Sequence, residues 1–272
     1  MTPMSAPRTL PHALDLVPDM RRARARAGHL FLGLDFDGTL APIVARPEDA
    51  RLPEAVRATL EQLAARADTR VAVLSGRALA DVRARIDVPG LCFAGNHGLE
   101  IEGPGISELH PAAAAAVPAI RRLTEACRRQ LTGITGVIVE DKGVTLSVHY
   151  RLVAGEEARG RVRTTVHELA AAEPGVRVGQ GKLVLEVRPD VAFDKGTALA
   201  FLRGELHEDP GAPALFIGDD RTDEDAFREL GPEGWGIIVA EPVPAATLAR
   251  AWLRSPDEVA ALLARLAADD VP

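Results

Sequence analysis

The sequence predicts an α/β fold, with an open Rossmann-like core of mainly parallel strands and a small α+β domain inserted into it. Short apolar runs alternate with amphipathic helical patterns on both sides of the insertion, which is typical of strands buried on both faces of a parallel sheet. Between them, apolar and polar residues alternate as in antiparallel strands with one buried face. We expect these parts: an N-terminal arm at 1–27, the core at 28–107 and 189–272, and the inserted α+β domain at 108–188.

The first half of the core should alternate strand and helix. The apolar run Leu30–Leu34 predicts a strand at about 29–35, buried on both faces. A helix is expected from Pro53, since proline fits the first helical position, and Val56, Leu60 and Leu63 lie on its buried stripe. The next expected elements are a strand at 70–74, a helix to about Ile86 and a strand at 91–94.

The insertion has a different pattern of elements. We expect, in order, a helix at about 112–131, strands at 137–140 and 144–150, a helix at about 156–172, and strands at 176–178 and 182–188. Asp141-Lys142-Gly143 and Gly179-Gln180-Gly181 separate the paired strands and predict hairpin turns. One sheet face would pack on the two helices, and it consists of Leu146, Val148, Leu183, Leu185 and Val187.

The α/β pattern resumes after the insertion. A helix is expected from Asp194 to about His207, followed by buried strands at 214–217 and 235–239. Ser255-Pro256-Asp257-Glu258 is a capping box with proline at the first helical position, so it predicts the start of a final helix.

Composition excludes several kinds of partner. Apolar residues make up 47% and charged residues 26% of the 272 residues, as in a globular chain with a sizeable core. The net charge of −7 argues against a nucleic-acid or anionic-membrane partner.

We find no stretch as long as a membrane span and no apolar segment of a secretory signal. Cys92 and Cys127 lack metal-ligand spacing. We therefore expect a cytoplasmic protein with reduced cysteines.

Polar residues that suit phosphoryl transfer follow the expected core strands. Asp35 and Asp37 are two residues apart at a strand end, so they point the same way and repel unless a cation or a shared proton holds them. A carboxylate pair that only caps the next element is the structural alternative. The other polar residues at these ends are Ser75, Lys195, Asp219, Asp220 and Asp223. Ligands bind at this edge of an open α/β sheet. Carboxylates suit Mg²⁺, and a lysine with hydroxyls suits a phosphoryl group.

The chain resembles the haloacid dehalogenase superfamily of phosphatases. The four motifs of that superfamily match Asp35-Phe36-Asp37-Gly38-Thr39, Ser75, Lys195 and Gly218-Asp219-Asp220. Within it, the chain is similar to the trehalose-6-phosphate phosphatase family over about 29–240, and the insertion corresponds to the family's cap. This narrower resemblance rests on Ser75-Gly76-Arg77, Gly95-Asn96-His97-Gly98-Leu99-Glu100, Val139-Glu140-Asp141-Lys142-Gly143, Val148-His149-Tyr150-Arg151, Leu185-Glu186-Val187-Arg188-Pro189 and the segment from Gly218 to Phe227. One departure is Phe36, where tyrosine is frequent.

The resemblance implies a Mg²⁺-dependent phosphatase of trehalose biosynthesis that hydrolyses trehalose 6-phosphate through an aspartyl-phosphate. Asp35 would be the nucleophile, and Asp37 would protonate the leaving oxygen and then deprotonate water. Thr39, Ser75 and Lys195 would hold the phosphoryl oxygens. We prefer Lys195 to Lys142 for this role, although both stand in Asp-Lys-Gly, because Lys195 opens a helix of the core. The metal set would be Asp35, the carbonyl of Asp37 and Asp219, with Asp220 and Asp223 positioning Asp219 and Lys195.

The sugar contacts implied by the resemblance lie in both parts of the chain. The expected substrate-binding residues are Arg77, Asn96, His97, Glu140, Lys142, His149, Lys182, Glu186 and Arg188. Alternatives stay open for several of them. Lys142 is either an exposed turn residue or a substrate contact, and His97 either orients its loop or touches substrate. The polar face of the inserted sheet is either a sugar-binding surface or a solvated, salt-bridged face.

Two other functions remain as alternatives. One is a different sugar phosphatase, or a phosphosugar mutase, on the same scaffold, although a mutase calls for a more basic cap. The other is a catalytically silent regulatory domain. Such a domain would be free to lose catalytic residues, yet the chain retains all of Asp35, Asp37, Lys195 and Asp219. We expect a monomer that acts on a small sugar phosphate.

Overall fold

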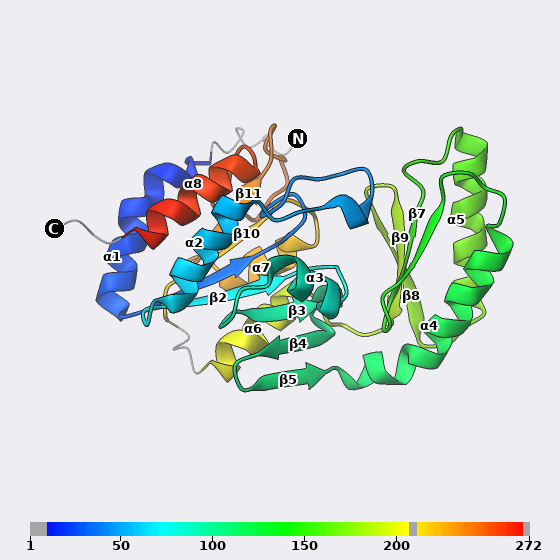
Figure 1. Ribbon diagram of the computed structural model, residues 1–272, viewed down its shortest axis with the longest axis horizontal. Helices are drawn as coiled ribbons and strands as arrows, with labels where there is room; N and C mark the ends of the chain where they lie inside the picture. The colour runs from blue at the N-terminus through cyan, green and yellow to red at the C-terminus, as the bar shows by residue number, and fades with distance from the viewer. Residues whose placement is uncertain (1–9, 207–210, 269–272) are drawn as a thin grey trace, which may run out of the picture. The chain divides into compact units, whose positions relative to one another are not determined.

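The structure is a computed structural model that describes residues 10–206 and 211–268. It consists of two compact units. Unit 1 contains the described residues up to Ser107 and from Phe193 onward, and unit 2 is Glu108–Ala192. Figure 1 gives the element labels used below. Within the described ranges, we find no helix with both the length and the apolar character that crossing a membrane requires.

A twisted sheet forms the centre of unit 1. Its strands run in the order β12-β11-β10-β1-β2-β3-β4-β5, and the first six of these pair in parallel. Strand β4 is antiparallel to β3. The bounds are β1 Leu30–Leu34, β2 Thr69–Leu74, β3 Cys92–Gly95, β4 Glu100–Gly103, β5 Ile106–Leu109, β10 Ala214–Gly218, β11 Trp235–Val239 and β12 Ala251–Leu253. Every residue of β1 is buried, so this strand is central as its apolar run predicts.

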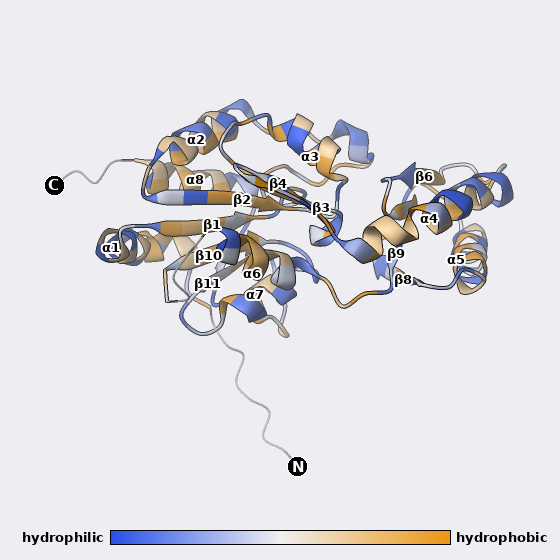
Figure 2. Cartoon of the chain, turned by 90° about the horizontal axis from the view of Figure 1, so that it is seen from below, coloured by the Kyte–Doolittle hydropathy of each residue, from blue (hydrophilic) through white to orange (hydrophobic). Residues whose placement is uncertain are grey.

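Helices cover both faces of this sheet. Leu30, Leu32 and Leu34 of β1 pack with α1, α2, α3 and α8, whereas Phe31 packs with α6 and α7 on the other face. In Figure 2, α2, α3 and α8 lie above the strands and α6 and α7 below them. The bounds are α1 Val17–Ala27, α2 Glu54–Ala65, α3 Leu79–Ile86, α6 Lys195–Glu205, α7 Asp223–Leu230 and α8 Pro256–Ala267, with 3-10 helices η1 Ala13–Leu16, η2 Pro47–Asp49 and η3 Asn96–Gly98. Helix α6 ends before His207, which lies outside the described residues.

The described part of the expected N-terminal arm is folded onto the core. Ala13, Val17 and Met20, from η1 and α1, are buried among the residues of α2 and α8. Arg24 is only 1% exposed, and its Nη1 donates to the carbonyl oxygen of Leu266 at 2.9 Å. The arm was expected because this segment is rich in proline and arginine, but the apolar face of α1 and the bond to the end of α8 hold it in place.

Unit 2 is a sheet with two helices on one face. Its strands run in the order β6-β7-β9-β8 and all pairs are antiparallel. The bounds are α4 Pro111–Gln130, β6 Ile138–Asp141, β7 Leu146–His149, α5 Glu156–Ala171, β8 Val176–Gly181 and β9 Val184–Pro189. Leu146, Val148, Leu185 and Val187 are buried in one cluster with residues of α4 and α5, as the alternating pattern predicts.

The second hairpin of unit 2 turns at a different place from the one expected. Gly181 pairs with Val184, so the turn is Lys182-Leu183, and Gly179 and Gln180 lie inside β8. Pairing with β9 extends β8 through Gly179 and Gly181, so neither glycine forms the turn. Leu183 adopts a left-handed φ of 62° and is partly buried. Lys182 and Leu183 are therefore turn residues and not strand residues as expected, although Leu183 still packs against the buried cluster of this sheet.

Candidate active site

A buried lysine joins two carboxylates at the carboxyl ends of adjacent strands. Lys195 is the first residue of α6, a helix whose start is fixed by Asp194, because Asp194 Oδ1 accepts from the backbone N–H of Thr197 at 2.9 Å. Lys195 Nζ donates to Asp35 Oδ1 at 2.7 Å and to Asp223 Oδ1 at 2.6 Å. These three side chains are at most 6% exposed. The site therefore contains a buried positive charge that is bound by two carboxylates.

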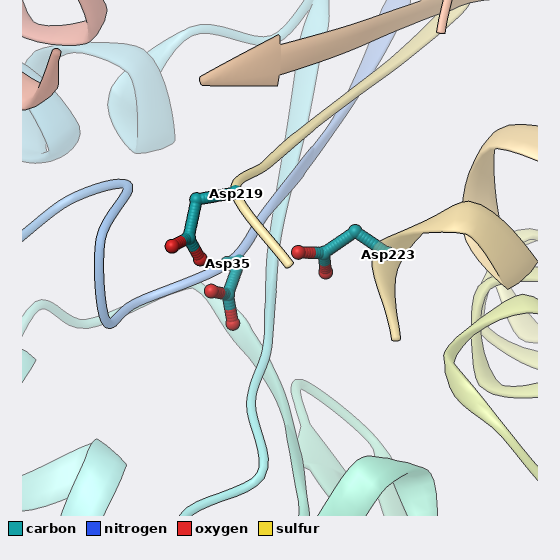
Figure 3. Close-up of side chains that lie close together, drawn as sticks. All are labelled: Asp35, Asp219 and Asp223. Atoms are coloured by element: carbon teal, nitrogen blue, oxygen red, sulfur yellow. The ribbon is translucent and has the colours of Figure 1, made fainter. Parts of the chain in front are cut away.

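Asp219 adds a third carboxylate to this cluster, and Figure 3 shows it beside Asp35 and Asp223. Oxygens of the three residues lie within 4.8 Å of one another. They meet because β10, which precedes Asp219, pairs in parallel with β1. Gly38 makes room for Asp219, since a Cβ on Gly38 would overlap that carboxylate and its φ of 83° is left-handed. The oxygen donors fit a hard divalent cation such as Mg²⁺.

The electrostatics of the cluster favour such an ion. Burial raises the pKa of Asp35 well above its ordinary value, Lys195 opposes this, and the nearby Asp223 and Asp219 add to it. Burial lowers the pKa of Lys195, but the two carboxylates outweigh burial and raise it, so the lysine stays charged. A divalent cation among the three carboxylates would lower the pKa of Asp35 again, because an opposite charge favours the ionised form.

Hydroxyls predicted to bind a phosphoryl group lie in buried positions. Thr39 is fully buried, and its Oγ1 has no hydrogen-bond partner within the described part of the chain. Such a hydroxyl is costly unless a ligand or water satisfies it. Ser75 is 1% exposed and its Oγ accepts from the backbone N–H of Arg77 at 3.2 Å. The buried hydroxyls of Thr39 and Ser75 therefore suit a ligand whose oxygens accept hydrogen bonds.

Asp37 and Asp220 differ in environment from the three clustered carboxylates. The carboxylate of Asp37 accepts from Arg77 Nε and Nη2, each at 2.7 Å, and is not in the cluster of three. Asp220 Oδ1 accepts from the backbone N–H of Arg221 at 2.6 Å. The backbone N–H of Asp220 in turn donates to Asp223 Oδ2 at 2.9 Å. Asp220 therefore holds Asp223 through its backbone, while its own carboxylate caps a turn.

Asn96 and His97 form a strained turn against the Ser75-Gly76-Arg77 loop. Their φ values of 49° and 59° are left-handed, which is uncommon for residues other than glycine. The backbone N–H of Asn96 donates to the Arg77 carbonyl at 2.7 Å and that of His97 to the Ser75 carbonyl at 2.9 Å. The side-chain amide of Asn96 donates to Glu100. These contacts orient the loop, and Asn96 is fully buried.

The polar residues expected to contact sugar form pairs on one face of the unit 2 sheet. His149 Nε2 lies 2.7 Å from Glu140 Oε2, and Lys142 Nζ lies 3.6 Å from Glu186 Oε1. The Lys142 side chain is 7% exposed, so its interpretation as an exposed turn residue was wrong. Arg188 lies opposite Arg177 in the β9–β8 pair. Lys182 is at the hairpin tip and exposed.

Asp81 and Arg85 extend the network of Arg77, and neither residue was predicted from the sequence. Asp81 Oδ2 accepts from Arg77 Nη1 at 2.7 Å, and both oxygens of Asp81 accept from Arg85 Nε. The spacing of Asp81 and Arg85 within α3 was an available signal, because residues four apart lie side by side on a helix surface.

Comparisons with known proteins agree with the fold. A solved structure of a haloacid dehalogenase-like hydrolase from Bacteroides thetaiotaomicron is 17% identical, with a TM-score of 0.60, over 88% of this chain and 99% of that chain. The trehalose-6-phosphate phosphatase C-terminal domain of C. albicans is 24% identical, with a TM-score of 0.78, over 96% of this chain and 99% of that chain. The molecule thus has the haloacid dehalogenase-like hydrolase fold.

The family is defined more closely by sequence. The model of the trehalose-phosphatase family matches residues 33–246. The trehalose-phosphate phosphatase of Mycobacterium marinum is 42% identical over 238 residues, which are 86% of this chain and 60% of that protein. This chain belongs to the trehalose-phosphatase family. It spans about 60% of the length of the curated relatives it matches.

Replacing the bridging lysine should destabilise the fold in a pH-dependent way. Lys195→Met leaves buried carboxylates without their cation, which should cost about 3–5 kcal/mol of unfolding free energy at neutral pH. With Lys195 gone, the pKa of Asp35 rises further. A carboxyl whose pKa is higher in the folded than in the unfolded state destabilises the fold as pH rises. The loss should therefore shrink as pH falls. Urea unfolding in chelator between pH 5 and 8 measures it.

The exposed Lys182→Met is the matched control and should change stability little at any pH. A Lys195→Met protein as stable as its parent, or a loss independent of pH, would contradict this description of the cluster.

Proposed function

We propose that this chain is a Mg²⁺-dependent phosphatase that hydrolyses trehalose 6-phosphate to trehalose and phosphate. The observation that supports this best is the cluster of the buried Lys195, Asp35 and Asp223 with the partly buried Asp219, in a member of the trehalose-phosphatase family. A curated relative at 42% identity is a trehalose-phosphate phosphatase. The reaction belongs to trehalose biosynthesis.

In the first step, an Asp35 carboxylate oxygen attacks phosphorus while the bond from phosphorus to the sugar oxygen breaks. Asp37 gives its proton to that oxygen, so trehalose leaves neutral and an aspartyl-phosphate remains on Asp35. Lys195 and the hydroxyls of Thr39 and Ser75 hold the phosphoryl oxygens, which offsets the charge that develops there.

In the second step, water attacks the phosphorus of the aspartyl-phosphate. Its proton goes to the Asp37 carboxylate, the bond from phosphorus to Asp35 breaks, and phosphate is released with Asp35 restored. One residue serves both steps because an acid that has given up its proton is the base the next step needs.

Mg²⁺ would be held by Asp35, Asp219 and the backbone carbonyl of Asp37, with Asp223 and Asp220 supporting the site. When bound, the ion neutralises charge between an anionic nucleophile and a phosphate dianion. The clustered carboxylate oxygens and the raised pKa of Asp35 support this assignment.

Residues of unit 2 are proposed to recognise the sugar. Glu140, Lys142, His149, Glu186 and Arg188 offer donors and acceptors to a neutral, hydroxyl-rich ring, with Lys182 at the hairpin tip. In unit 1, Asn96 and His97 shape the loop beside Ser75. In this proposal residues 108–188 act as the cap of the family, and the protein is a cytoplasmic monomer without nucleic-acid or membrane partners.

The proposal predicts metal-dependent release of phosphate with a preference for trehalose 6-phosphate over other sugar phosphates. Excess EDTA should abolish turnover, and Asp35→Asn should abolish it in Mg²⁺ because the nucleophile is lost with little change in volume. Asp15→Asn, which changes an exposed aspartate of η1, is the control. A phosphate-release assay over a sugar-phosphate panel measures all of these.

Full activity in EDTA with no metal retained in the protein would rule out the metal role. No activity on any member of the panel would favour a silent regulatory domain. Preference for another sugar phosphate would favour a different sugar phosphatase on the same scaffold.

Glu186 separates sugar recognition from a solvated sheet face. If its carboxylate accepts from sugar hydroxyls, Glu186→Ala should cost about 1.5–3 kcal/mol, roughly ten- to a hundredfold in kcat/KM for trehalose 6-phosphate. Hydrolysis of a small aryl phosphate, which has no sugar, should change little. Glu168→Ala, an exposed glutamate of α5, is the matched control. Unchanged rates with both substrates would return Glu186 to the solvated face.

A further inference from the structure

Arg77 was expected to bind substrate, yet nearly all of its donors are taken within unit 1. Its Nε and Nη2 donate to the two oxygens of Asp37, each at 2.7 Å. Nη2 also donates to the Pro47 carbonyl at 2.9 Å, and Nη1 donates to Asp81 at 2.7 Å. Of its N–H groups, a single one on Nη1 has no bond to a described residue. The side chain is 7% exposed, and its guanidinium lies 5.3 Å from the centre of the Phe36 ring.

A chain of alternating charges continues beyond Arg77. Asp81 accepts from Arg77 on one side and from Arg85 Nε, at 2.8 and 2.9 Å, on the other. Arg85 Nη1 in turn donates to the carbonyls of Ala50 at 2.7 Å and Glu48 at 3.3 Å. Burial raises the pKa of Asp81, but the hydrogen bonds from Arg85 and Arg77 outweigh it and lower that pKa. Asp81 therefore stays ionised at neutral pH.

We propose that Asp81 and Arg85 are positioning residues for the acid–base carboxylate of Asp37, and that they act through Arg77. The inference rests on the proposed function and deepens it. Neither residue contacts Asp37. Asp81 holds Nη1 of Arg77, the part of the guanidinium that does not contact Asp37, and Arg85 holds Asp81. The carbonyls of Glu48 and Ala50 hold Arg85 in turn. The planar fork of Arg77 then holds both oxygens of Asp37 in one orientation, leaving a further lone pair on each for the proton.

The exposed fractions of these side chains explain why Asp37 needs such support. The Asp37 side chain is 39% exposed, so packing alone does not set its rotamer. Asp81 is 33% exposed and Arg85 16%. Removing Asp81 frees one end of Arg77, and removing Arg85 frees Asp81. Because a misplacement of about 1 Å in a reacting group costs up to about a hundredfold in rate, a loosened Asp37 should cost about tenfold.

The two substrates of the proposed enzyme separate this role from simple structural damage. p-Nitrophenolate leaves without a proton, so the first step with p-nitrophenyl phosphate does not need Asp37, whereas the second step does. For Asp81→Asn and Arg85→Gln we therefore expect kcat/KM for this substrate to stay within about twofold of the parent while kcat falls about tenfold. For trehalose 6-phosphate, which needs the acid in the first step, kcat/KM itself should fall about tenfold.

Rapid mixing of each variant with p-nitrophenyl phosphate and Mg²⁺ gives an independent readout. We expect a burst of about one nitrophenolate per active site followed by slow turnover, because the aspartyl-phosphate accumulates. Arg83→Gln is the matched control, since Arg83 is on the same helix, is 58% exposed and pairs with Glu102 instead. It should resemble the parent. Thermal unfolding midpoints show whether each variant folds. If Arg85→Gln does not fold, Asp81→Asn, which changes little volume, still tests the inference.

Either of two outcomes overturns the inference. One is that the Asp81 and Arg85 variants match Arg83→Gln in every parameter. The other is that kcat/KM falls equally with both substrates and no burst appears. A parent protein that hydrolyses neither substrate would instead overturn the proposed function, so the two failures are distinguishable.

Discussion

The hydrogen bonds of one buried lysine hold together the edge of the unit 1 sheet at which the proposed active site lies. Lys195 contacts Asp35 at the end of β1 and Asp223 at the start of α7, and it stands at the start of α6. Three segments far apart in the sequence are therefore tied through a single ammonium group. A buried ion pair of this kind is costly to break, because removal of either partner leaves an uncompensated charge. The surrounding fold must therefore keep Lys195 beside its carboxylates, and Gly38 leaves the space that Asp219 occupies.

Two aspartates of the same strand end acquire different chemistry from their different cations. Asp35 is buried beside a lysine and other carboxylates, an environment that suits a nucleophile held near a metal ion. Asp37 is partly exposed and bound by the planar fork of Arg77, which orients a carboxylate for proton transfer. The period of a strand predicts that both side chains point the same way, but β1 ends at Leu34, before either aspartate. Their surroundings separate their roles, because Lys195 of α6 binds Asp35 whereas Arg77, in the loop before α3, binds Asp37.

Much of this architecture was predictable from local patterns. The apolar runs predicted the central strands, and their polar ends predicted that Asp35, Lys195, Asp219 and Asp223 belong to one edge of the sheet. The resemblance to a family supplied the proposed roles. Features decided by distant partners were not predictable in the same way. The hairpin at Lys182-Leu183 depends on the pairing of β8 with β9. Burial of α1 depends on contacts with α2 and α8, and the assignment of Arg77 changed because its partner is forty residues earlier in the chain.

The central claim is that Asp35 carries the phosphoryl group between the two steps. Its most direct test is to mix an Asp37→Asn variant with p-nitrophenyl phosphate and Mg²⁺, quench in acid, and map the modified peptide by mass spectrometry. The variant lacks the base for the second step, but this substrate needs no acid in the first. We predict one phosphoryl group on the peptide that contains Asp35. A phosphoryl group on another residue, or nitrophenolate release with no phosphorylated peptide at any time, would contradict the account.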